Sequence, residues 1–152
     1  MSADPILEIH GLSHDGRGVA RLDGTVVFVV GGLPGQQVRA RVLRRKPRFW
    51  EAASTEVLRQ TPDAVPPLCP HGDACGGCPL QTLPQARQLA WKRTLVLDAL
   101  ERVGGLPRPE LEALLGPVAA SPATTRFRNK MELAFGPDAA GLPVLGQRPA
   151  PF

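Results

Sequence analysis

The sequence has few of the features that place a protein in a membrane or outside the cell. Among its 152 residues, no apolar run approaches the ~20 residues that a membrane-spanning helix requires. The first residues show no basic start followed by an apolar stretch, so we expect no secretory signal. Internal repeats and low-complexity tracts are also lacking. We therefore expect a globular protein of the cytoplasm, a monomer with no membrane partner.

Cysteine is scarce, and its three occurrences all fall within ten residues. An odd count and tight spacing argue against a disulfide framework. The residues Cys69, Cys75 and Cys78 form a C-x5-C-x2-C pattern in a loop rich in glycine and proline. Such a loop lets three thiolates converge while backbone amides point toward the sulfurs. The pattern therefore indicates a metal or iron–sulfur site.

Two kinds of site stay open on this pattern alone. An iron–sulfur cluster needs a fourth cysteine, which this sequence does not contain. A zinc ion could take His71 as its fourth ligand, but Cys69 and His71 are only two residues apart. Structural zinc sites usually draw their ligands from two separated pairs. Free reactive thiols are a third alternative, although they do not explain why three cysteines lie together.

Lysine is also scarce, with 3 residues against 15 arginines, and the net charge is +4. A basic balance favours polyanionic partners, although arginine abundance can also reflect genomic base composition. The distribution of charge is more specific. A basic stripe without an acidic residue comprises Arg39, Arg41, Arg44, Arg45, Lys46 and Arg48. This basic stripe is either a solvated strand end or a phosphate-contacting surface, with Phe49 or Trp50 as a platform on which a base stacks.

The first sixty residues predict short strands separated by turns. Asp23-Gly24 lies between two β-prone runs and is a strong hairpin signal, because a type I′ turn needs positive φ at both central positions. In the run 37–43 valine and alanine alternate with arginine and leucine, which predicts one buried face. Val27, Phe28 and Val29 are expected in the core. The strands are expected at residues 6–10, 19–22, 25–30, 36–44 and 51–58. This number of short strands predicts a small OB-like barrel over residues 1–60.

The remaining sequence predicts a joint, helices and the start of another β-region. Residues 61–81 form a proline-rich linker that contains the cysteines. A helical segment is expected over 82–117: Thr82 and Gln85 fit a capping box, Gly104-Gly105 ends the first helix, and a short helix follows at 109–115. Leu89, Val96, Leu100 and Val103 share one face of the first helix at helical spacing. Residues 118–152 predict an incomplete β-rich domain with strands at 126–135 and 142–147, joined by a turn at 136–138. The expected class is mainly β with α.

Several motifs together resemble one enzyme family. The motifs are Gly16-Arg-Gly18-Val-Ala20, Val27-Phe28-Val29, Leu33-Pro34-Gly35-Gln36, Cys75-Gly-Gly-Cys78-Pro-Leu-Gln81, Gln88-Leu89 with Lys92, and Phe127-Arg128-Asn129-Lys130. In this order they resemble the N-terminal region of the uracil-C5 RNA methyltransferases that carry a TRAM domain and a [4Fe–4S] cluster. The bacterial rRNA-modifying members are the most similar.

This resemblance implies the roles of several residues. Cys69, Cys75 and Cys78 would supply three of the four cluster ligands, the fourth coming from a later domain. The partner would be RNA, of the 23S rRNA type, and the methyl donor S-adenosylmethionine. In the family a catalytic cysteine attacks C6 of uracil, but no catalytic or cofactor-binding residue can be matched in this sequence. The candidate RNA contacts are Arg39, Arg41, Arg44, Arg45, Lys46, Arg48, Trp50, Arg128 and Lys130.

Two other functions compete with this one. A stand-alone RNA-binding module with an iron–sulfur or zinc site, and no catalysis, would have the same barrel and cysteines. A TRAM-containing radical methylthiotransferase would need a C-x3-C-x2-C pattern and a TRAM domain after its catalytic domain. The observed spacing and the position of the barrel disfavour that enzyme.

Overall fold

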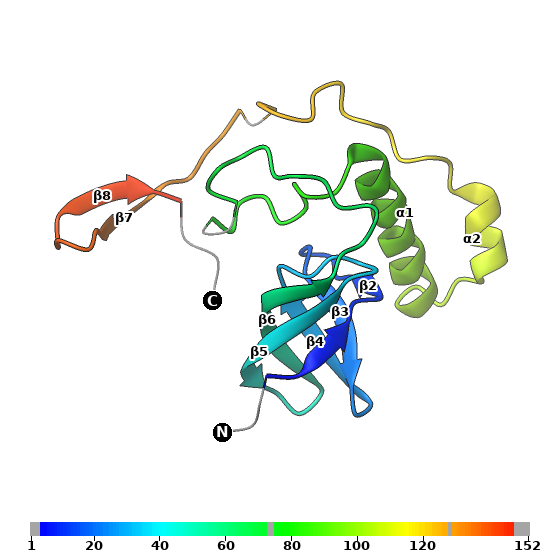
Figure 1. The fold of residues 1–152 in the computed structure, drawn as a ribbon. Coiled ribbons are helices and arrows are strands. Elements are labelled where there is room, and N and C mark those ends of the chain that lie inside the picture. Colours follow the sequence, from blue (N-terminus) through cyan, green and yellow to red (C-terminus); the bar gives the residue numbers. More distant parts are fainter. Residues whose placement is uncertain (1–3, 73–74, 128, 148–152) are drawn as a thin grey trace.

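The structure is a computed structural model that describes residues 4–72, 75–127 and 129–147. Within these ranges a six-stranded mixed sheet forms the first part of the chain, and two helices and a two-stranded hairpin follow it (Figure 1). The sheet strands are β1 (Ile6–Glu8), β2 (Gly11–Leu12), β3 (Gly18–Leu22), β4 (Thr25–Val30), β5 (Gln37–Arg45) and β6 (Phe49–Arg59). The predicted OB-like fold is confirmed, with the short strand β2 in addition to the five expected strands.

The segment from Ile6 to Leu12 closes the sheet into a barrel. The strand order is β1-β5-β6-β4-β3-β2, so β1 and β2 lie at its opposite ends although they are consecutive in the sequence. Between the two strands, the backbone of His10 donates a hydrogen bond to Val19 of β3 at 2.9 Å. One short stretch of chain therefore pairs with both edges of the sheet, which leaves neither edge open over that stretch.

The barrel core follows from the alternation of side chains along the strands. Val27 and Val29 of β4 are fully buried, as are Val38 and Ala40 of β5, which confirms the face predicted for that strand. Phe28 lies between the two buried valines and faces outward, half-buried, so its predicted place in the core is wrong. Successive residues of a strand point to opposite faces, and therefore the three cannot share one face. The core cluster consists of Leu7, Ile9, Ala20, Val27, Val29, Val38, Ala40 and Ala52.

The turn between β3 and β4 has the predicted geometry. Asp23 has φ 47° and Gly24 has φ 79°. Positive φ at both positions is what a type I′ turn requires, and its twist matches that of the flanking strands. The hairpin pairs Leu22 with Thr25 directly across the turn. The predicted Asp-Gly hairpin is confirmed.

A second apolar cluster joins the barrel to the linker and the first helix. Leu12 and Leu33 of the barrel are buried together with Leu83, which precedes the helix. Trp91 of the first helix lies half-buried against this cluster. Burying a leucine side chain contributes about 1.5–3 kcal/mol relative to leaving it exposed. The cluster therefore fixes the linker on the barrel.

The helices are α1 (Gln85–Arg102) and α2 (Arg108–Leu114). Within the described residues, Pro84 is the N-cap of α1 and no side chain caps it, so the predicted capping box at Thr82 is wrong. The four apolar residues predicted to share one face of this helix are not fully buried. Leu97 is the buried residue of α1, whereas Val96 is 44% and Val103 is 89% exposed. No helix in the described ranges is long and apolar enough to cross a membrane.

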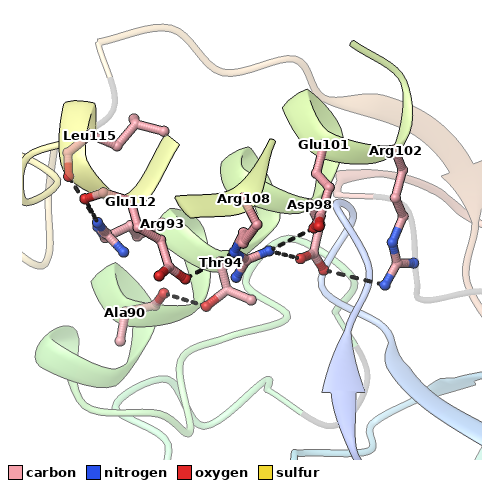
Figure 2. A network of polar contacts seen from close by, with 9 residues as sticks. All are labelled: Ala90, Arg93, Thr94, Asp98, Glu101, Arg102, Arg108, Glu112 and Leu115. Carbon is pink, nitrogen blue, oxygen red and sulfur yellow. Dashed lines mark hydrogen bonds and ion pairs between the residues drawn. The ribbon is translucent and has the colours of Figure 1, made fainter. Parts of the chain in front are cut away.

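An arginine at the start of α2 holds the two helices together (Figure 2). Arg108 binds Asp98 at 2.7 Å and Glu101 at 3.2 Å, both on α1, and Glu112 of its own helix at 3.0 Å. Hydrogen bonds to Asp98 and Glu112 are the main causes that raise the pKa of Arg108 above its ordinary value. Arg93 of α1 donates to the backbone oxygen of Leu115 at 2.8 Å, which satisfies a carbonyl at the end of α2. Polar contacts therefore set the position of α2.

The last described part is a hairpin of β7 (Ala134–Pro137) and β8 (Pro143–Gly146), which extends away from the barrel (Figure 1). The strand predicted over 126–135 is confirmed only at its end, and Pro137 lies in β7 instead of in the turn. Asp138 makes the turn, because its carboxylate accepts hydrogen bonds from the backbone of Ala140 and Leu142. Apolar side chains of this hairpin are exposed, with Phe135 83% accessible.

Candidate nucleic-acid interface

The basic stripe lies on β5 and in the turn that leads to β6. Val38 and Ala40 point into the barrel, and therefore Arg39 and Arg41 between and beyond them point outward. The register shifts between Val42 and Arg44, where β5 has an irregularity opposite β6. The remaining cations of the stripe, Arg44, Arg45, Lys46 and Arg48, follow at the exposed end of the strand and in the turn.

Most of these cations already have a partner. Arg39 forms an ion pair with Glu56 at 3.0 Å, and Glu51 lies 3.9 Å from Arg44 and 3.3 Å from Lys46. Among the described residues, no ion pair involves Arg41, Arg45 or Arg48. Arg45 lies over the Trp50 ring, so Arg41 and Arg48 are the two cations of the stripe most available to a phosphate.

The aromatic residues beside the stripe lie under cations. The guanidinium of Arg45 is 4.5 Å from the centre of the Trp50 ring, and the ammonium of Lys46 is 4.9 Å from that of Phe49. Trp50 is half-buried and packs against the barrel core, so one side of its ring is taken by the core. Phe49 lies on the outer face, where its ring meets Phe28 edge-on at 5.3 Å.

A further arginine belongs to this surface and was not predicted. Arg17 lies across Phe28, with its guanidinium carbon 4.9 Å from the ring centre. Asp15 and Glu51 flank it at 2.8 Å and 3.6 Å. The parallel pairing of β4 with β6 explains the arrangement, because it sets Phe28 directly opposite Glu51. The feature of the sequence that could have indicated Arg17 is its position between two glycines, Gly16 and Gly18.

Hydrogen bonds shape the loop that carries Arg17. The Ser13 hydroxyl donates to Asp15 and accepts from the backbone of Arg17 at 3.0 Å. Burial raises the pKa of Asp15, but the hydrogen bond from Ser13 and the charge and hydrogen bonds of Arg17 outweigh this, so that its pKa lies below the ordinary 3.8. Asp15 is therefore charged at neutral pH and fixes the position of Arg17.

The cysteine loop is held by backbone contacts. The amide of Cys69 donates to the side chain of Gln81 at 3.3 Å, and that of Cys75 to the carbonyl of His71 at 2.9 Å. All three cysteines are free thiols; Cys69 and Cys75 are half-buried and Cys78 is exposed. In the described part of the chain, no three His, Cys, Asp or Glu residues are placed so that they could hold a metal. The structure does not bring the three thiols together as a preformed site for a cluster, nor with His71 as one for zinc.

A cleft of about 680 Å³ separates the barrel from the cysteine loop. Arg17, Arg41 and Ser54 line it from the barrel, and Cys75 and Cys78 line it from the loop. The volume is within the range of ligand-binding clefts. The free cation of β5 and two of the three predicted ligands therefore face one space.

The candidates near the C-terminal end are less well supported. Arg128 lies outside the described residues. Lys130 forms an ion pair with Glu132 at 2.8 Å, and both side chains are largely exposed. These two residues border a second hollow of about 460 Å³ together with Phe127 and Met131. No contact in the described part of the chain joins Lys130 to the basic stripe.

The comparison with protein families decides what the barrel is. Residues 7–53 match the model of the TRAM domain. The chain carries a TRAM domain. β1 from its second residue, β2 to β5 and the start of β6, together with Arg17 and the basic stripe, lie within the matched residues.

The similarity to known proteins continues beyond the TRAM domain. An uncharacterized RNA methyltransferase of Nitratidesulfovibrio vulgaris is 42% identical over 140 residues, which are 92% of this chain and 29% of that protein. The 23S rRNA (uracil(1939)-C(5))-methyltransferase RlmD of Azoarcus sp. is 39% identical over 91% of this chain and 31% of its own length. RlmD of Xanthomonas euvesicatoria is 48% identical over 69% of this chain and 24% of its own length.

The chain spans less than a third of the length of these relatives and corresponds to their N-terminal part. Among solved structures, the tRNA (uracil-54, C5)-methyltransferase of Pyrococcus abyssi in complex with S-adenosyl-L-homocysteine is 28% identical. That match covers 66% of this chain and 21% of the other, with a TM-score of 0.40.

Proposed function

We propose that this chain is the N-terminal, RNA-binding part of an RNA (uracil-C5)-methyltransferase that acts on 23S rRNA. The observation that carries the proposal is the similarity, over 91% of the chain, to a relative named for that activity. The TRAM match and the outward-facing basic stripe support RNA as the partner. The protein works in the cytoplasm as a monomer.

The chemistry belongs to the part of the enzyme that these residues do not include. S-adenosylmethionine supplies the methyl group, and this chain contributes no catalytic residue. Its own residues bind and orient RNA: the stripe neutralises phosphates, with Arg41 and Arg48 as the most available cations. Trp50, Arg128 and Lys130 are further proposed contacts.

We also propose that Cys69, Cys75 and Cys78 are the ligands that this chain supplies to a [4Fe–4S] cluster. Their spacing and their state as free thiols support this proposal. The described arrangement does not fit a preformed site, so the loop would have to rearrange to bring the sulfurs together. Anaerobic treatment of the purified chain with iron and sulfide tests this: bound iron that is lost in Cys75→Ser is expected, and equal iron in both proteins would contradict it.

The methyltransferase proposal is tested by deleting the gene that encodes the chain in its source organism. Mass spectrometry of digested 23S rRNA should then show the loss of one 5-methyluridine, which the intact gene restores. A loss from tRNA alone would contradict the rRNA target. If no 5-methyluridine were lost from any RNA, the enzyme proposal would be wrong and a non-catalytic RNA-binding module would remain.

A further inference from the structure

The glycines on each side of Arg17 have packing reasons. A Cβ on Gly18 would lie 2.7 Å from the carbonyl oxygen of Gly32 and 2.8 Å from a methyl of Ile9. Gly16 has φ +83°, and a Cβ there would lie 2.9 Å from Pro79 of the cysteine loop. All three distances are shorter than ordinary van der Waals contacts. The side chain of Arg17 is the part of this motif that such packing does not explain.

The guanidinium of Arg17 lies over the ring of Phe28 and between two carboxylates. Phe28 lies beneath it at 4.9 Å, and Asp15 and Glu51 hold its nitrogens from two sides. The side chain still keeps 27% of its surface exposed. A guanidinium placed in this way has one side against an aromatic ring and presents a planar group at the protein surface.

The charges around Arg17 select the kind of group that can bind there. Two carboxylates already neutralise it, so a phosphate would meet repulsion from Asp15 and Glu51. A neutral, planar group has no such penalty. Unpaired RNA bases stack on aromatic side chains and on arginine planes. Arg17 is therefore suited to bind an RNA base and not an RNA phosphate.

The cations near Arg17 are suited to bind the phosphate backbone of the same RNA strand. Arg41 faces the cleft that Arg17 also lines, and within the described residues it has no acidic partner. Lys46 lies over Phe49, whose ring is 5.3 Å from that of Phe28. Cations on both sides of a stacking surface are the arrangement found where proteins bind single strands.

We propose that Arg17, stacked on Phe28, is a platform for one unpaired base of single-stranded RNA. The neighbouring phosphate of the RNA lies toward Arg41, which lines the same cleft as Arg17. The inference rests on the RNA-binding function proposed above and adds to it the form of RNA and the residue that contacts the base. It places the contact on the outer face of β4 and β6 and on the loop before β3, beside the basic stripe.

The test uses the 152-residue chain and a short fluorescein-labelled oligouridylate, with binding followed by fluorescence anisotropy over a range of salt concentrations. Arg17→Lys keeps the charge and removes the planar group. Arg21→Lys is its matched control, because Arg21 is an exposed arginine of β3, the strand that directly follows Arg17, and among the described residues its side chain donates to the backbone of Gly24. Phe28→Leu keeps an apolar side chain and removes the ring. Phe135→Leu, on the exposed hairpin, is the control for that change.

A base stacked on an aromatic side chain contributes about 1–3 kcal/mol, which corresponds to at least about fivefold in affinity. We expect Arg17→Lys and Phe28→Leu each to weaken binding by that factor with an unchanged salt dependence, since no charge is lost. Both control variants should bind as the unaltered chain does. Thermal melting of every variant shows whether the fold is kept, and Phe28→Leu tests the platform if Arg17→Lys does not fold.

The outcomes separate this inference from the proposed function. If the unaltered chain binds the oligouridylate but Arg17→Lys and Phe28→Leu bind as well as their controls, the platform is wrong while RNA binding stands. If the unaltered chain does not bind, the RNA-binding function itself is wrong and the platform falls with it. A selective loss in both variants supports the platform.

Discussion

Glu51 forms ion pairs with cations of the proposed RNA-binding face, and removing its charge should let such cations bind phosphates. Its carboxylate lies 3.6 Å from Arg17, 3.9 Å from Arg44 and 3.3 Å from Lys46. It is the one acid that pairs with several of these cations in the described residues. In Glu51→Gln the shape is kept and up to two cations, Arg44 and Lys46, become available to phosphates, while Arg17 keeps its ion pair with Asp15.

The expected size of this effect follows from counterion release. For single strands the slope of log K against log salt changes by about 0.7 for each phosphate that is neutralised. Glu51→Gln should therefore steepen the slope by up to about 1.4. Glu56→Gln is the matched control, because it also raises the net charge by one but releases Arg39 alone, so it should change the slope by at most about 0.7.

The assay is a salt titration of oligouridylate binding to the three proteins, followed by fluorescence anisotropy. Exposed ion pairs contribute about 0–1 kcal/mol each, so both variants should keep nearly the stability of the unaltered chain. Equal slopes for Glu51→Gln and Glu56→Gln would refute the reasoning, because they would show that the local grouping of cations does not matter. A slope unchanged from that of the unaltered chain would refute it as well.

Three further predictions concern stability. Gly16→Ala should lower the free energy of unfolding by at least about 1 kcal/mol more than Gly24→Ala does. Both glycines have positive φ, but only at Gly16 would the added Cβ collide with another residue, Pro79. Equal urea midpoints for the two variants would contradict this. Leu7→Ala should cost about 2–5 kcal/mol, and Ile6→Ala, at a position 51% exposed, should cost clearly less by the same measurement. The stability that Asp15 contributes is present above its ordinary pKa of 3.8 and is lost as the pH falls through its lower folded-state pKa. Asp15→Asn should flatten that acid-side decline in thermal melting, and an identical pH profile would argue against it.

Local patterns predicted the barrel because they depend on neighbouring residues. The Asp23-Gly24 turn needs only its own φ angles, and the alternation in β5 needs only the pleat of the strand. β2 was missed because its two residues, Gly11 and Leu12, become a strand only when the sheet closes on itself. The run from Thr25 to Val30 is apolar throughout, so the sequence could not show that Phe28 faces outward.

The site was harder to predict because distant residues build it. The sequence shows the basic stripe but not its ion pairs. The pairing of β6 with β4 and β5 brings Glu51 next to the cations with which it forms ion pairs. The buried face of α1 was also hard to predict, because it depends on residues distant in the sequence. Leu97 is buried where Val96 is not, because contacts outside the helix decide which of its faces is covered. The arrangement of the three cysteines depends on the loop conformation, which their spacing does not determine.

The strand order has a consequence for the synthesis of the protein. β6 lies between β4 and β5 in the sheet. A ribosome must therefore release the chain as far as Arg59 before the six-stranded sheet is complete. Until then β4 and β5 have no common neighbour, and the segment from Ile6 to Leu12 connects the two ends of the sheet.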